Sequence, residues 1–179
     1  MVSLCFAVGV VKFRHRQGPK QNIYMKISKE QFNMYDMKKE RSYWEGTGAA
    51  NRRIMYIAAG YQNNDILKKP HIGIANTFFE GSPGTAHLRT LAENVKKGIW
   101  MAGGMPMEFG VPATCGNMAT GSDGLRYELA LRDIVAMSIE SVVKIHKLDG
   151  LVIMASCDNI IAGAYLAALR VHIPCIVVT

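Results

Sequence analysis

Short apolar runs alternate with longer amphipathic segments along most of the chain. The strand candidates, which are apolar and often β-branched, are 71–77, 106–114, 151–156 and 173–179. The helix candidates, where apolar residues recur every three or four positions, are 48–62, 85–104, 129–148 and 160–170. A glycine-rich and polar segment, 115–124, is expected to be a loop.

From residue 71 onward, strand and helix candidates follow one another in strict alternation, which predicts an α/β fold with a parallel sheet flanked by helices. Ligands of such sheets gather at the carboxyl ends of the strands. The loops 76–84, 114–124 and 156–159 follow the first three strands, so we expect them to converge on one crevice. The sequence stops at Thr179, at the end of an apolar run, and we therefore expect an incomplete amino-terminal domain of a larger protein.

Charge is distributed unevenly along the chain. Residues 1–41 hold nine Lys or Arg against three Asp or Glu, so they carry most of the formal net charge of +7. We therefore predict a basic, mobile extension over residues 1–36 and an α/β domain over residues 37–179. A basic tail on a nearly neutral domain is more typical of a solvated segment than of a groove for phosphates, so no nucleic-acid partner is expected.

The cysteines indicate a reducing compartment. The four of them show no CxxC spacing and are too sparse for a disulfide-stabilised secreted domain. The apolar run near residue 1 is too short to span a membrane, and its positive charges follow it instead of preceding it, unlike those of a signal peptide. We expect a cytoplasmic protein without a membrane partner.

Three ordered segments resemble a known family. They read "KPHIGIANTFFEGSPGTAHLRTLAENVKKGIWMAGGMPMEFGVPAT", "MATGSDGLRYELALRDIVAMSIE" and "LDGLVIMASCDNIIAGAYLAALRVHIPCIVVT". Together they resemble the amino-terminal portion of the dihydroxy-acid dehydratase and sugar-acid dehydratase family over about residues 40–179. The resemblance rests on several segments in order, not on one short pattern.

The resemblance implies a hydro-lyase that converts a 2,3-dihydroxy acid to a 2-keto acid, as in branched-chain amino acid biosynthesis. In that family an iron–sulfur cluster acts as Lewis acid on the departing hydroxyl, and Mg²⁺ holds the substrate's carboxylate. A serine, which would lie beyond Thr179, takes the proton. The resemblance also implies a homodimer of the full-length protein. It leaves the cluster type open, and both branched-chain and sugar acids remain candidate substrates.

Carried over by position, Cys157 matches a cluster ligand and Asp158 a magnesium ligand. A thiolate is the soft donor that suits iron–sulfur iron, and a carboxylate is the hard donor that suits Mg²⁺. Without the resemblance, a lone cysteine at a strand end is more often a small buried hydrophobe. Glu80 matches an acidic or amide position of the family. Gly84 stands where one branch has a further cluster cysteine and the other has glycine. Cys115 is interpreted as a buried loop thiol, with ligation as the alternative.

Two departures affect the magnesium half of the site. The family has aspartate at the position of Gly116 and a carbamylated lysine at that of Asn159. Asp158 is then the one expected anionic contact left, with Asp123 as a possible substitute. We therefore expect weak magnesium binding, which Gly116→Asp with Asn159→Lys would restore.

The departures keep a second hypothesis open: a degenerate or fragmentary homologue that has the fold but no activity. A third, a nucleotide-binding α/β domain, is disfavoured because no strand candidate is followed by a GxGxxG or P-loop motif.

Overall fold

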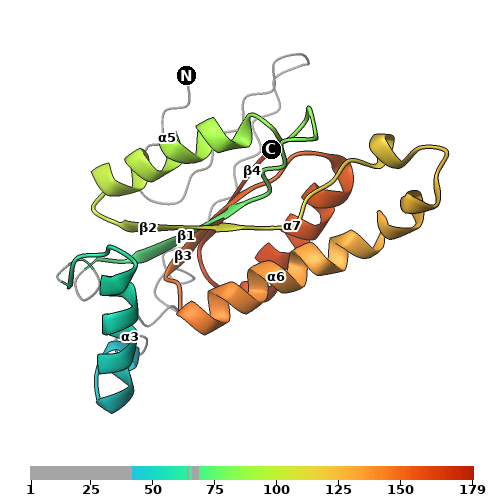
Figure 1. The fold of residues 1–179 in the computed structure, drawn as a ribbon. Coiled ribbons are helices and arrows are strands. Elements are labelled where there is room, and N and C mark those ends of the chain that lie inside the picture. Colours follow the sequence, from blue (N-terminus) through green and yellow to red (C-terminus); the bar gives the residue numbers. More distant parts are fainter. Residues whose placement is uncertain (1–41, 64, 66–68) are drawn as a thin grey trace.

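The structure is a computed structural model that describes residues 42–63, 65 and 69–179 (Figure 1). Its four strands form one sheet, in which every pair is parallel and the order is β2-β1-β3-β4. The strands are β1 (His71–Asn76), β2 (Met105–Gly110), β3 (Gly150–Met154) and β4 (Cys175–Val178). The predicted α/β fold with a parallel sheet is confirmed. The predicted extension 1–36 and its boundary at residue 37 lie outside the described residues.

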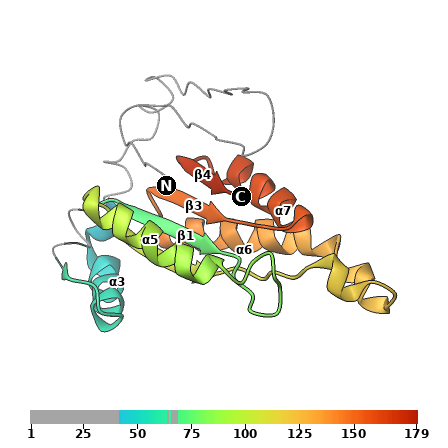
Figure 2. The same ribbon diagram turned by 90° about the horizontal axis from the view of Figure 1, so that it is seen from above.

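A helix follows each of the first three strands, and the helices cover both faces of the sheet (Figures 1 and 2). The helices are α5 (Leu88–Met101), α6 (Ala130–His146) and α7 (Asp158–Val171). Figure 1 shows α5 on one face, and α6 with α7 on the other. An earlier pair, η1 (Ser42–Trp44) and α3 (Thr47–Ala58), precedes the sheet. Among the described residues, no helix has the length and apolar character needed to cross a membrane.

Alternation along the strands explains why both faces carry a core. In β3, Val152 and Met154 pack in the cluster beneath α5, whereas Leu151 and Ile153 pack in the cluster shared with α6 and α7. Successive side chains of a strand point to opposite faces, so a continuous apolar run fills both layers. This is the physical reason why the strand candidates read as uninterrupted hydrophobic runs.

Helices α6 and α7 pack against each other at very short range. A Cβ added to Gly163 in α7 would lie 2.7 Å from the backbone oxygen of Arg132 and 2.8 Å from Cβ of Val135, both in α6. Only glycine permits this approach without displacing a helix. The packing brings the amino-terminal end of α6 beside the amino-terminal end of α7, where the candidate site lies.

The segment expected to be a loop contains two short 3₁₀ helices, η2 (Gly116–Ala119) and η3 (Asp123–Tyr127). Between them Gly121 adopts φ of +79°, a conformation that side chains with a Cβ rarely adopt, and the Ser122 hydroxyl donates to the Ala119 carbonyl at 2.9 Å. These turns lead the chain from β2 to Glu128, directly ahead of α6.

Candidate functional site

The carboxyl ends of the first three strands meet at one edge of the sheet, as their register requires. Asn76 at the end of β1 pairs with Gly110 of β2 and with Met154 of β3. Just beyond, the Thr77 hydroxyl, which is fully buried, donates to the Met154 carbonyl oxygen at 2.9 Å. These contacts set the starting points of the three loops that were expected to converge.

The loop after β1 reaches the loop after β3. A Cβ added to Gly84 would lie 3.7 Å from the Ser156 hydroxyl oxygen, next to Cys157 in the chain. The position at which one branch of the family was expected to carry a further cysteine therefore adjoins the Cys157 corner. Glu80, in the same loop, has an exposed side chain and is not among the residues brought together there.

Cys157 occupies a strained backbone position between β3 and α7. Its φ of 77° and ψ of 142° lie close to a region that is populated almost entirely by glycine. Burial raises the pKa of its thiol to about 11, and hydrogen bonds to Asp158 and to Cys115 add to the rise. The thiol is therefore protonated at neutral pH unless a metal displaces the proton.

Asp158 opens α7 and keeps an ionised carboxylate. Its Oδ1 accepts the backbone N–H of Asn159 at 2.9 Å and lies 3.4 Å from the Cys157 Sγ. The Asn159 N–H is the main cause that holds the pKa of Asp158 below its usual value, and the Cys157 thiol adds to it. The carboxylate is solvent-exposed, so an incoming cation can reach it.

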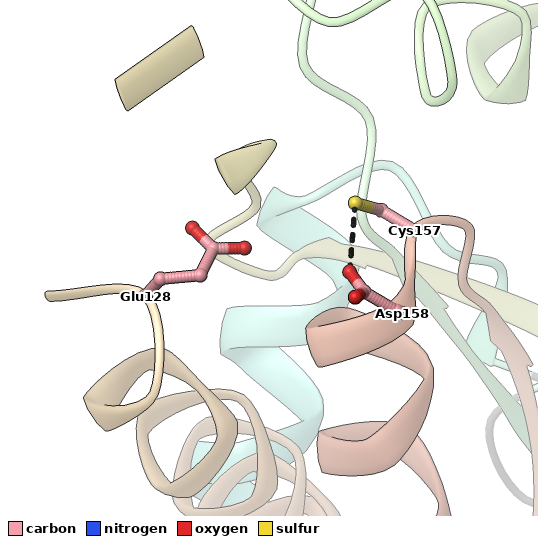
Figure 3. Close-up of side chains that lie close together, drawn as sticks. All are labelled: Glu128, Cys157 and Asp158. Carbon is pink, nitrogen blue, oxygen red and sulfur yellow. Dashed lines mark hydrogen bonds between the residues drawn. The ribbon is translucent and has the colours of Figure 1, made fainter. Parts of the chain in front are cut away.

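Glu128 is a third functional group of this corner, and the sequence analysis did not single it out. One ligand atom each of Glu128, Cys157 and Asp158 lies within 4.8 Å of the others. Figure 3 shows the three side chains close together. Glu128 is only 7% exposed, which is unusual for a carboxylate that forms no salt bridge within the described part of the chain. It precedes α6 by two positions and carries no motif, so nothing in a single sequence marks it.

The two departures from the family pattern both touch Glu128. A Cβ added to Gly116 would lie 3.2 Å from the Glu128 Cδ. Asn159, which is buried, donates from Nδ2 to the Glu128 Oε1 at 3.1 Å, while its Oδ1 accepts the Arg132 Nε at 2.7 Å. The amide of Asn159 is thus engaged at both ends, so its oxygen is not free to replace a lost anionic ligand.

Asp123, the substitute considered for the missing aspartate, points elsewhere. Its carboxylate is 3.3 Å from the Arg126 guanidinium, and both side chains are largely in solvent.

Cys175 lies in β4, where burial raises the pKa of its thiol to about 12, as expected for a core cysteine. Cys115 lies close enough to Cys157 for the two thiols to interact, so the site holds two sulfurs beside two carboxylates.

This donor set fits the groups that the sequence analysis expected. Thiols suit iron–sulfur iron, and the exposed carboxylate of Asp158 beside the buried carboxylate of Glu128 suits a hard divalent cation that retains several waters. The structure places a second carboxylate, that of Glu128, beside Asp158, and the sequence analysis did not consider it.

Comparisons with known proteins match most of the chain. The family described as "Dihydroxy-acid/6-phosphogluconate dehydratase N-terminal" matches residues 69–179. A protein of Methanococcus aeolicus named "Dihydroxy-acid dehydratase" is 47% identical over 135 residues, which cover 75% of this chain and 24% of the relative. Proteins of the same name from Methanobrevibacter smithii and Methanothermobacter thermautotrophicus are each 46% identical, with the same shares covered. The chain therefore spans about a quarter of the length of these relatives.

Proposed function

Since this chain belongs to the dihydroxy-acid/6-phosphogluconate dehydratase family, we propose that it is the amino-terminal part of a hydro-lyase that dehydrates a 2,3-dihydroxy acid to a 2-keto acid. The observation that carries the proposal is the juxtaposition of the Cys157 thiol with the carboxylates of Asp158 and Glu128 at the carboxyl edge of the sheet. Soft and hard donors side by side suit a reaction in which a hydroxyl and a carboxylate of one substrate must be held at once.

Cys157 would hold an iron–sulfur cluster, and Asp158 would hold Mg²⁺. When bound, the cluster would supply Lewis acidity toward the departing hydroxyl, and Mg²⁺ would supply positive charge for the substrate's carboxylate. Cys157 must release its proton to bind iron, and its raised pKa makes loading easier as the pH rises. Asp158 is ionised and anchored by a backbone N–H, so it presents its carboxylate without a change of protonation.

A second candidate function, a homologue that keeps the fold without the activity, is favoured by Gly116 and Asn159. Neither can supply an anionic ligand, since glycine has no side chain and the amide of Asn159 is neutral. That amide is also already hydrogen-bonded to Arg132 and Glu128. The two candidates differ in whether a cluster is loaded and whether substrate turns over.

The test uses the protein translated from the complete reading frame that contains this chain, purified without oxygen. Iron and sulfide content, visible absorbance and 2-keto acid release from branched-chain and sugar dihydroxy acids are measured for the wild type and for Cys157→Ser. We expect Cys157→Ser to lose the cluster and the turnover while keeping its fold. Cys175→Ala, which removes a core thiol of β4, should retain both and serves as the matched control. A cluster that loads fully in Cys157→Ser would refute the ligand assignment, and a loaded wild type that releases no 2-keto acid would favour the second candidate.

A further inference from the structure

Gly116 leaves a space that the Glu128 side chain fills. A Cβ added at Gly116 would lie 3.2 Å from Cδ, 3.3 Å from Oε1 and 3.4 Å from Cγ of Glu128, so the Glu128 side chain lies along the bare backbone of Gly116. A Cβ at position 116 would already require the Glu128 side chain to shift by a few tenths of an ångström, and the further atoms of an aspartate would require more. The two positions therefore adjoin one volume, and two carboxylates placed there would repel each other.

Within the part of the chain that the structure describes, the Glu128 carboxylate is buried without a salt-bridge partner. It is 7% exposed, and its described hydrogen bond is to the neutral amide of Asn159. Over residues 42–63, 65 and 69–179, no Lys or Arg forms a salt bridge with it. Removing a carboxylate from water is costly unless a positive charge or several hydrogen bonds replace the water. One amide donor uses one of about four acceptor sites of a carboxylate, which leaves the rest for a cation.

The orientation of Glu128 is set by a chain of hydrogen bonds that starts in α6. Arg132 Nε donates to Asn159 Oδ1 at 2.7 Å, and Asn159 Nδ2 donates to Glu128 Oε1 at 3.1 Å. Asn159 is buried, so water competes little for the hydrogen bonds of its amide. A lysine at position 159 has no acceptor atom for Arg132 and could not relay the contact.

The distances suit a shared cation between Glu128 and Asp158. Metal–oxygen distances of about 2.0–2.1 Å place two oxygens on one Mg²⁺ roughly 3–4 Å apart. The ligand atoms of Glu128, Asp158 and Cys157 already lie within 4.8 Å of one another, so a small side-chain movement closes the site. The hard carboxylates would take the divalent cation, and the soft thiol of Cys157 is left for iron.

We propose that Glu128 is a ligand of the divalent cation, that its carboxylate takes the volume vacated at Gly116, and that Asn159 is the positioning residue that holds it. The inference rests on the proposed function for the identity of the cation. It also reverses the expectation drawn from the sequence that Gly116→Asp with Asn159→Lys would restore metal binding. Asp at position 116 would crowd Glu128 and repel its carboxylate, and Lys at position 159 would remove the amide donor.

The test measures Mn²⁺ binding to the metal-stripped protein from the complete reading frame, by the loss of the free Mn²⁺ signal in electron paramagnetic resonance. Glu128→Gln keeps the size of the side chain and an oxygen for Asn159, and should weaken Mn²⁺ binding by about tenfold or more, the scale on which even residues supporting a metal ligand act. Asp158→Asn should do the same. Glu140→Gln, further along α6 where Glu140 pairs with Lys144 and Arg170, is the matched control and should bind like the wild type.

A relocation experiment tests the shared volume directly. Glu128→Ala and Gly116→Asp should each weaken Mn²⁺ binding when made singly, the first by removing a ligand and the second by displacing it. The double variant Gly116→Asp with Glu128→Ala should recover binding to within a few-fold of the wild type. Gly116→Asp with Asn159→Lys should bind more weakly than the wild type.

Failure of this inference and failure of the proposed function give different results. Unchanged Mn²⁺ binding in Glu128→Gln, or no Mn²⁺ binding by the wild type, would overturn the ligand assignment even if the protein forms 2-keto acids. Loss of Mn²⁺ binding in Glu128→Gln, with no turnover of any dihydroxy acid by the wild type, would uphold the ligand and overturn the dehydratase. Circular dichroism of each variant verifies that a loss of binding is not a loss of fold.

Discussion

Replacing Cys157 by glycine should stabilise the fold relative to replacing it by alanine. Both changes remove the thiol, so they differ only in the Cβ at a position with φ of 77° and ψ of 142°. A residue with a Cβ costs about 1–3 kcal/mol in such a region. Glycine avoids this cost but loses about 0.5–1 kcal/mol because it is more flexible in the unfolded chain. The balance favours Cys157→Gly over Cys157→Ala by about 1 kcal/mol in the free energy of unfolding.

The measurement is urea unfolding of the two metal-free variants at neutral pH in the presence of a reductant. The control is Ala162→Gly, at an interior position of α7, where the same loss of a Cβ should destabilise by about 1 kcal/mol. Loss of the Cβ should therefore change the free energy of unfolding in opposite directions at two positions that are five residues apart. If Cys157→Gly proves less stable than Cys157→Ala, the backbone at this corner is not strained and the inference from φ is wrong.

Two further predictions concern helix packing and pH. Gly163→Ala should destabilise the fold by about 1–3 kcal/mol, because the added Cβ meets the α6 backbone. Gly98→Ala in α5, where the added Cβ would have no described atom within 4 Å beyond its own helix backbone, should stabilise it by up to about 1 kcal/mol. Equal effects of the two substitutions in urea unfolding would contradict the close contact of α6 and α7. Burial raises the pKa of Glu108, but hydrogen bonds from Asn76 and Lys96 outweigh it and hold the pKa below the usual 4.5. This carboxylate therefore contributes stability above pH 4.5 that is lost as the pH falls through its lower folded-state pKa, and Glu108→Gln should flatten that part of the profile of unfolding free energy against pH. Identical acid profiles for the variant and the wild type would contradict this.

The fold was predictable from the sequence because its signals are local. The run 151–156 is apolar at every position up to Ala155, and only a strand buried on both faces needs Leu151 and Val152 in succession. The helical spacing from Leu88 to Ile99 likewise reports one buried stripe. Each of these patterns is complete within about fifteen residues, so no knowledge of distant contacts is required.

The site was predictable only where its parts are adjacent in the chain. Cys157 and Asp158 are neighbours, and the resemblance identified them together. Glu128 lies about thirty residues earlier and reaches them through the packing of α6 on α7, which depends on Gly163. The sequence analysis instead considered Asp123, the nearest acid after Gly116 in the loop, but the turn of η3 directs that carboxylate to Arg126 and solvent. Whether Asp123 or Glu128 faces the site depends on the path of the 3₁₀ turns, which a single sequence does not reveal.

The structure also changes what the two departures mean together. Considered one at a time, Gly116 and Asn159 are losses of negative charge, and unrelated losses in a decaying site would have no reason to involve the same third residue. Here both contact Glu128: one provides the volume that its carboxylate occupies, and the other donates the hydrogen bond that holds it. Residues in contact with a shared partner are expected to act non-additively, whereas independent losses add. The effects of substitutions at positions 116, 128 and 159 on cation binding should therefore be strongly coupled, which is the behaviour of a relocated ligand and not of a site that has lost its purpose.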